Sequence, residues 1–317
     1  MSKFGISLLR RCSLYLGLAA TLLFSACDSG AGVALSSAGG SLKILATTSM
    51  IGDIAARIAG PHATVESLMG PGVDPHLYKT SESDVRRLEN ADLILYNGLN
   101  LEGKMGEIFE ALSRSRRVVA VSKDITAAEL RTPPEFKGHH DPHIWFDVKL
   151  WSTVVGPIRR ELSSLDPAHA ADYVKNAETV AQELSSLDAW VESHVAMIPA
   201  DRRILVTAHD AFGYFGRRYQ VEVVALQGIS TVAEFSVHDV ERLTQRIVER
   251  KVPAVFIESS VPRRNIEAVQ KACEAKGHKV SIGGELFSDA MGAAGTPEGT
   301  YRGMVEHNVR LILQALR

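Results

Sequence analysis

The stretch "PAHAADYVKNAETVAQELSSLDAWVESHVAM", residues 167–197, decides how the rest of the chain is organised. Apolar residues recur in it at steps of three and four, which places them on one face of a helix. They are Tyr173, Ala177, Val180, Leu184, Leu187, Val191 and Val195. The pattern predicts a helix of about 30 residues, ~45 Å long at 1.5 Å per residue. We interpret it as a stiff connection between two halves, with a coiled-coil dimer stripe as the alternative.

Strand-like and helical patterns alternate on both sides of this helix. Short apolar, β-branched runs bounded by polar or turn residues predict buried strands. They occupy residues 42–48, 91–98, 117–122, 202–208, 221–226, 253–259 and 278–284. Helical patterns fall at residues 81–90, 236–251, 261–277 and 296–316. This order predicts the α/β class, with two parallel-sheet lobes at residues 42–166 and 198–317 joined by one long rigid helix at 167–197.

The N-terminal residues 1–26 have the pattern of a secretory signal peptide. Basic residues precede an uncharged run that is shorter than the roughly 20 residues a membrane-spanning helix needs. The ending "LLFSAC" resembles a bacterial lipobox, in which the cysteine, here Cys27, becomes the lipidated first residue. An ordinary signal peptide cut near Ala26 is the alternative. We expect residues 27–41 to be a flexible tether, and the protein to lie in the periplasm or on the outer face of the cytoplasmic membrane.

Composition excludes several kinds of partner and site. The 317 residues carry a formal net charge of −2, which gives no reason to expect a nucleic-acid partner. Of three cysteines, only Cys273 lies beyond the predicted leader and its lipidation site, so the folded part has no disulfide and no multi-thiolate metal site. Any metal there must be bound by histidine, aspartate or glutamate.

Four polar residues lie next to strand-like runs, and in α/β sheets ligands commonly bind beyond the ends of strands. His209 follows "ILVTA", and His76 follows "VESLM" after a Gly-Pro-Gly turn. His143 opens "HIWF", and Asp289 follows the last predicted strand. Their wide spacing excludes the local His-Glu-x-x-His zinc signature. The residues alone leave open whether each is a ligand or an ordinary loop or core residue.

A resemblance covers the chain from about Leu42 to its end. The motifs that carry it are, in order, "GPGVDPHLYKTSESDVRRLENADLILYNGLNLEGKMGEIFE", "DPHIWFDVKLW", "TAHDAFGYFGRRY", "LQGISTVAEF", "IESSVPRRNIEAVQ" and "GGELFSDAMGAAGTPEGTY". They resemble the metal-binding solute-binding proteins of bacterial ABC transporters, cluster A-I, closest to the TroA-like zinc and manganese binders. In that family the metal lies in the cleft between two α/β lobes joined by one long helix.

The resemblance implies the ligands and the metal. His76 and His143 would come from the first lobe, and His209 and Asp289 from the second. Many manganese-binding relatives have glutamate at the position of His209. Three imidazoles and one carboxylate suit Zn²⁺, with Mn²⁺ second and Fe²⁺ less favoured. Because ligating histidines must be neutral, we expect affinity to fall below about pH 6.5.

Neighbouring residues receive supporting roles. We expect the strand-like Ile144–Phe146 to hold His143. Asp74, Asp147, Asp210 and Glu258 are candidates to orient a ligating imidazole, with solvated surface carboxylates as the alternative. Glu285 is the alternative to Asp289 as the carboxylate ligand. His139 and His140 are expected to be solvated, with weak metal collection as the alternative.

The implied function is extracytoplasmic capture of a divalent transition metal and its delivery to an ABC transporter permease driven by a cytoplasmic ATPase. The protein would be a lipid-anchored monomer and not an enzyme. Two alternatives remain. A secreted zinc hydrolase would keep one coordination position open for water, whereas four protein ligands close the site. A surface adhesion or interaction lipoprotein would use exposed patches that a sequence does not reveal.

Overall fold

The structure is a computed structural model that describes residues 41–134, 136 and 138–317. The predicted signal peptide, Cys27 and nearly all of the tether therefore lie outside the described residues. Within the described part of the chain, no helix is both long and apolar enough to cross a membrane.

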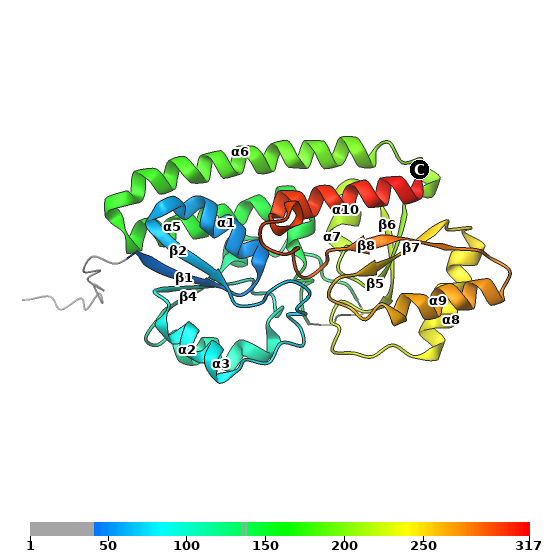
Figure 1. The fold of residues 1–317 in the computed structure, drawn as a ribbon, viewed down its shortest axis with the longest axis horizontal. Helices are drawn as coiled ribbons and strands as arrows, with labels where there is room; N and C mark the ends of the chain where they lie inside the picture. Colours follow the sequence, from blue (N-terminus) through cyan, green and yellow to red (C-terminus); the bar gives the residue numbers. More distant parts are fainter. Residues whose placement is uncertain (1–40, 135, 137) are drawn as a thin grey trace, which may run out of the picture. The chain divides into compact units, whose positions relative to one another are not determined.

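The first lobe is built on a parallel four-stranded sheet in the order β2-β1-β3-β4. Its strands are β1 (Leu42–Ala46), β2 (Ala63–Ser67), β3 (Leu93–Tyr96) and β4 (Arg117–Ala120). The helices are α1 (Ser49–Ala59), α2 (Glu82–Asn90), α3 (Gly106–Leu112), α4 (Val148–Trp151) and α5 (Val155–Leu165). Figure 1 shows α1 and α5 on one side of this sheet and α2 and α3 on the other.

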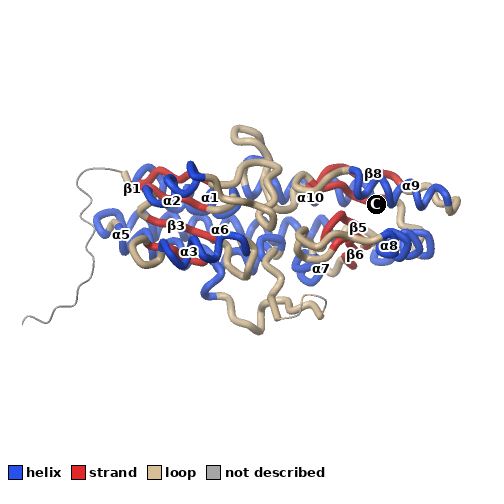
Figure 2. Tube along the Cα trace, turned by 90° about the horizontal axis from the view of Figure 1, so that it is seen from below, coloured by secondary structure: helices blue, strands red, loops and turns tan. Residues whose placement is uncertain are grey.

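The second lobe contains two parallel strand pairs. They are β5 (Ile204–His209) with β6 (Glu222–Gln227), and β7 (Ala254–Glu258) with β8 (Ser281–Leu286). The helices are α7 (Gly213–Tyr219), α8 (Val237–Glu249), α9 (Arg264–Ala275) and α10 (Tyr301–Leu316). Helices flank the strands in both lobes (Figure 2). The predicted α/β class with parallel sheets is therefore confirmed.

The long helix α6 spans Ala170–Val195 and follows a 3₁₀ turn at Pro167–His169. Its buried residues are the seven predicted from the periodicity. They face α1, α4 and α5 of the first lobe and α10 of the second, and α10 runs beside α6 in Figure 1. The apolar stripe is thus covered within the chain, which removes the basis for the coiled-coil alternative.

Two local predictions were incomplete or wrong. Strand β2 was missed because its residues alternate between half-buried and exposed, as expected at a sheet edge, and show no continuous apolar run. Residues Ile144–Phe146 form a 3₁₀ turn and not a strand. All three side chains are buried although the backbone turns, and the Asp147 side chain accepts the Leu150 N–H at 2.9 Å and so caps α4. An apolar run alone does not distinguish such a turn from a strand.

Candidate metal centre

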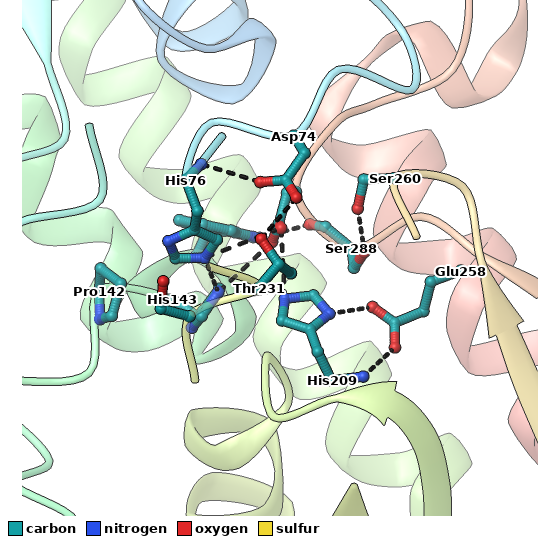
Figure 3. A network of polar contacts seen from close by, with 12 residues as sticks. Asp74, His76, Pro142, His143, His209, Thr231, Glu258, Ser260 and Ser288 are labelled. Carbon is teal, nitrogen blue, oxygen red and sulfur yellow. Dashed lines mark hydrogen bonds and ion pairs between the residues drawn. The ribbon is translucent and has the colours of Figure 1, made fainter. Parts of the chain in front are cut away.

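Four buried side chains, those of His76, His143, His209 and Asp289, meet between the two lobes. Each offers one ligand atom, and these atoms all lie within 4.8 Å of one another. His209 ends β5, Asp289 follows β8, and His76 lies in the loop between β2 and α2. His143 directly precedes the 3₁₀ turn at Ile144–Phe146. Figure 3 shows the three imidazoles turned toward one another.

The separations between these atoms are those of ligands around one small cation. The Nε2 atoms of His209 and His143 lie 3.2 and 3.4 Å from oxygens of Asp289. His76 Nε2 lies 3.3 Å from His143 Nε2 and 3.9 Å from Asp289. Ligands about 2.1 Å from a tetrahedral zinc ion are about 3.4 Å apart by geometry. The donor set therefore fits a Zn²⁺-sized ion without large rearrangement.

The cluster contains polar atoms that the protein itself does not satisfy. By hydrogen-bond geometry, His209 Nε2 and both carboxylate oxygens of Asp289 are buried without a partner among the described residues. An unsatisfied buried polar atom costs about 1–3 kcal/mol, and a charged one costs more. A bound cation would remove this cost at all three atoms.

Two of the imidazoles are oriented by carboxylates at their second nitrogen. His143 Nδ1 lies 2.8 Å from Asp141, and His209 Nδ1 lies 2.5 Å from Glu258. Glu258 also accepts the N–H groups of Ala208 and His209 on β5, at 2.7 and 2.9 Å. With the proton at Nδ1, Nε2 carries the free lone pair that a metal needs. Glu258 was among the predicted candidates, whereas Asp141 was missed.

Asp141 is itself held by groups from both lobes. Arg131 forms an ion pair with its carboxylate, and the Tyr214 hydroxyl on α7 donates to its backbone carbonyl at 2.9 Å. The Arg131 N–H in turn donates to the Tyr214 hydroxyl at 3.0 Å. The sequence did contain a signal for Asp141, because it stands at the same place in "DPH" as Asp74.

His76 is held in a different way. Its backbone N–H donates to Asp74 at 2.8 Å, and among the described residues no carboxylate pairs with its Nδ1. The pKa of its ring reflects this environment, because burial dominates and lowers it to about 3. The imidazole of His76 is thus neutral at neutral pH.

The imidazoles of His143 and His209 and the carboxylate of Asp289 shift one another's pKa through the attraction between opposite charges. Burial opposes the charged form of His143, but Asp141 and Asp289 outweigh it and raise the pKa to about 9. Burial is likewise outweighed at His209, where Glu258 and Asp289 raise the pKa well above its ordinary value. The same imidazoles hold the pKa of Asp289 well below its usual range against the effect of burial. A metal must therefore displace protons to bind.

The remaining candidates lie outside the cluster. His139 is exposed, and His140 Nδ1 lies 2.9 Å from the Thr132 hydroxyl. Glu285, the rival of Asp289, is exposed on β8. Asp147 caps α4, Asp74 accepts a backbone N–H, and Asp210 orients no imidazole of the cluster. Of the four candidate carboxylates, of which one or more were expected to orient an imidazole, Glu258 is the one that pairs with a ring of the cluster.

Comparison with known proteins places this geometry in context. The family model "ZnuA: Zinc-uptake complex component A periplasmic" matches residues 44–315. The chain is 52% identical over 279 residues to the zinc-binding protein TroA of Treponema pallidum (strain Nichols), covering 88% of this chain and 90% of that one. It is 45% identical over 304 residues to the manganese-binding lipoprotein MntA of Bacillus subtilis (strain 168), covering 95% and 99%.

A solved structure agrees over the same region. The periplasmic zinc-binding protein TroA from Treponema pallidum superposes with a TM-score of 0.85 at 52% identity. The match covers 87% of this chain and 99% of that one.

Proposed function

The chain belongs to the ZnuA family of periplasmic zinc-uptake components, and from this membership we propose that it captures a divalent transition metal outside the cytoplasm for uptake. It is the substrate-binding component of an ABC transporter, which implies a permease and, through it, a cytoplasmic ATPase as partners. The function is one of binding and transfer and not of catalysis.

The observation that carries the proposal is the cluster of His76, His143, His209 and Asp289, which we propose as the metal ligands. All four are buried, their ligand atoms lie within 4.8 Å of one another, and two of the imidazoles have carboxylates at their second nitrogen. Four protein ligands leave no coordination position for a reactive water, as a hydrolase would need. The family consists of metal-binding transporter components and not of enzymes, and this argues against the hydrolase alternative.

Zinc is the metal that this donor set favours. Three neutral imidazoles and one carboxylate suit Zn²⁺, and the Irving–Williams order places Mn²⁺ far below zinc at a mixed nitrogen and oxygen site. Among the residues that the structure describes, neither oxygen of Asp289 has a hydrogen-bond partner, so Asp289 can bind through both and admit the higher coordination of Mn²⁺. The relatives named above include a zinc binder and a manganese binder. We rank Mn²⁺ second and Fe²⁺ third.

The finer partner assignments are also proposals. We infer that Cys27 is acylated and anchors the mature chain to a membrane as a monomer. The lipobox-like "LLFSAC" supports the anchor, and the relative from Bacillus subtilis is named a lipoprotein. Mass spectrometry of the mature N-terminus tests it: a diacylglycerol mass on Cys27 is expected, and an unmodified N-terminus after Ala26 would contradict it.

Metal competition tests the function itself. The soluble chain, residues 28–317, is stripped with chelator, offered equimolar Zn²⁺ and Mn²⁺, and analysed for bound metal by mass spectrometry. We expect one zinc per chain, lost in His209→Ala and kept in the control His169→Ala, whose imidazole is partly exposed and pairs with Asp166. Predominant manganese would keep the transport function and change the metal. No stoichiometric metal would overturn the site and return attention to the adhesion alternative.

A further inference from the structure

The three imidazoles of the cluster differ in how firmly each is fixed. Asp141 and Glu258 hold the rings of His143 and His209 through hydrogen bonds to Nδ1. His76 is held through its backbone, by the N–H that donates to Asp74 at 2.8 Å. The position of this one ligand therefore depends on the loop that carries it.

That loop, residues 70–77 between β2 and α2, is here called the His76 loop. Among the described residues it has one internal backbone hydrogen bond, from Val73 N–H to the Gly70 carbonyl at 3.3 Å. A segment with so few internal bonds is fixed mainly by what it touches. Part of what it touches belongs to the second lobe. At Gly72, where φ is +71°, an added Cβ would lie 3.3 Å from the carbonyl oxygen of Ser259.

Asp74 supplies the polar link between the His76 loop and the second lobe. One carboxylate oxygen accepts the His76 N–H, and the other accepts the hydroxyl of Thr231 at 2.6 Å. Thr231 lies 157 residues further along the chain and is buried. In Figure 3 Asp74 stands between His76 and Thr231. A single carboxylate thus ties the backbone of a ligand to the opposite lobe.

The same pair forms part of the wall of a cavity of about 470 Å³. Asp74 and Leu77 line it from the His76 loop, and Gln227, Thr231, Phe235 and Val261 are among its second-lobe residues. The Asp74–Thr231 hydrogen bond thus joins two lining residues of this cavity, and Asp74 also holds the backbone of His76 in the buried cluster. Breaking it would release the His76 loop on the side where space is available.

We propose that the Asp74–Thr231 hydrogen bond is a latch that controls metal release. While it is formed, Asp74 keeps His76 against the second lobe and the cluster stays closed. When it breaks, His76 withdraws with its loop, and the metal leaves through the cavity beside Thr231. The inference rests on the proposed metal-capture function and adds the residues that set the rate of release.

The test measures zinc release from the purified protein into excess chromogenic chelator. Thr231→Val removes the hydroxyl and keeps the side-chain shape. We expect it to release zinc about tenfold faster or more, because a hydrogen bond to a charged group is typically worth at least that factor. Thr231→Ser keeps the hydroxyl and should release zinc at the wild-type rate. Thr126→Val is a matched control, since it breaks a threonine–carboxylate hydrogen bond of 2.7 Å to Glu129 elsewhere.

Bound zinc per chain is counted in the same samples, so that a failure of the latch proposal can be distinguished from a failure of the proposed capture function. If Thr231→Val binds one zinc and releases it at the wild-type rate, the latch is wrong and the capture function stands. If the wild type binds no stoichiometric zinc, both are wrong. Asp74→Asn provides a second variant, because an asparagine oxygen still accepts the His76 N–H but the charged acceptor for Thr231 is gone. It should also release zinc faster, and a wild-type rate in this variant would likewise overturn the latch.

Discussion

Asp74 and Asp141 stand at the same position of two Asp-Pro-His triplets, yet the two carboxylates have different partners. Each accepts the N–H of the histidine two residues later, at 2.8 and 3.0 Å, which is the local turn that such a triplet favours. Asp141 also pairs with the ring of its own histidine, whereas Asp74 reaches Thr231. The triplet thus determines the turn, and tertiary contacts determine what the second interaction of each carboxylate is.

The role of Asp141 leads to a first prediction. Asp141→Asn should lower zinc affinity about 10- to 100-fold, the usual effect of removing a carboxylate that orients a metal-bound imidazole. Zinc competition against a chelating dye measures it. The control is Asp166→Asn, which alters a similar Asp–His pair at 2.6 Å to His169, away from the cluster. An equal effect of both substitutions would mean that Asp141 acts only through general stability.

The residues around the cluster show which parts of the site could be predicted from the sequence. Strand-like runs placed His76, His209 and Asp289 near the ends of strands, but only the resemblance selected them as ligands. Glu258 ends its strand in the same way as His209, and so was a visible candidate for a supporting role. The contact of Thr231 with Asp74 joins residues 157 positions apart and has no local signal.

Among the elements, helix α6 is held in place by the packing of its seven buried residues. Because burial of apolar surface is the main source of folding stability, these seven residues should carry most of the helix's contribution. We predict that Leu184→Ala lowers the free energy of unfolding by about 2–5 kcal/mol, the usual cost of a buried leucine-to-alanine change. Chemical denaturation measures it, with the exposed Gln182→Ala on the same helix as the control. A change below about 1 kcal/mol would show that the first lobe does not depend on this packing.

A side chain of the other lobe lies against Gly213, the first residue of helix α7. A Cβ at Gly213 would overlap the guanidinium of Arg131, which is paired with Asp141. Gly213→Ala should therefore push Arg131 away from Asp141 and weaken zinc binding about tenfold, within the range for disturbing such supporting contacts. Gly106→Ala on α3 is the control, because an added Cβ meets nothing within 4 Å there. Unchanged zinc affinity in Gly213→Ala would show that zinc binding does not depend on the position of Arg131.

Helices and strands could be predicted from the sequence where their buried residues form a continuous run or a regular period. They could not be predicted where burial alternates along a strand or where a buried segment turns. Seven strands and the stripe of α6 followed from runs or periods of apolar residues. The last of these strands begins later than expected, at Ser281, and β2 was missed at the sheet edge. The buried turn at Ile144–Phe146 was mistaken for a strand because burial, and not backbone extension, produces its apolar run.

For the molecule as a whole, the main core is continuous across both lobes. One apolar cluster includes Ile44 of β1, Leu184 of α6, Leu205 of β5 and Ile312 of α10. The four proposed ligands come in pairs from the two lobes. Occupation of the site should consequently be coupled to the stability of the whole chain, since a metal that binds only the folded state stabilises it by mass action.

This coupling predicts opposite pH dependences for the Tm of the metal-free protein and for the rise in Tm that zinc causes. The pKa of His143 rises from 6.5 to about 9 on folding, and that of His209 rises in the same direction. A raised imidazole pKa stabilises the folded state fully below pH 6.5, and this contribution is lost as pH rises through about 9. His76, with a lowered pKa, is neutral in both states above pH 6.5 and contributes nothing there.

The metal-free Tm should therefore fall between pH 6.5 and 9, by an amount on the order of 5 °C. Zinc must displace these protons, so the rise in Tm on adding zinc should grow over the same interval. The pH below which protons compete with zinc is therefore about 9, and not the 6.5 expected from the sequence. Differential scanning calorimetry with and without zinc measures both trends, and His143→Gln should flatten the metal-free curve. A metal-free Tm that rises across the interval would mean that the folded cluster does not hold these protons.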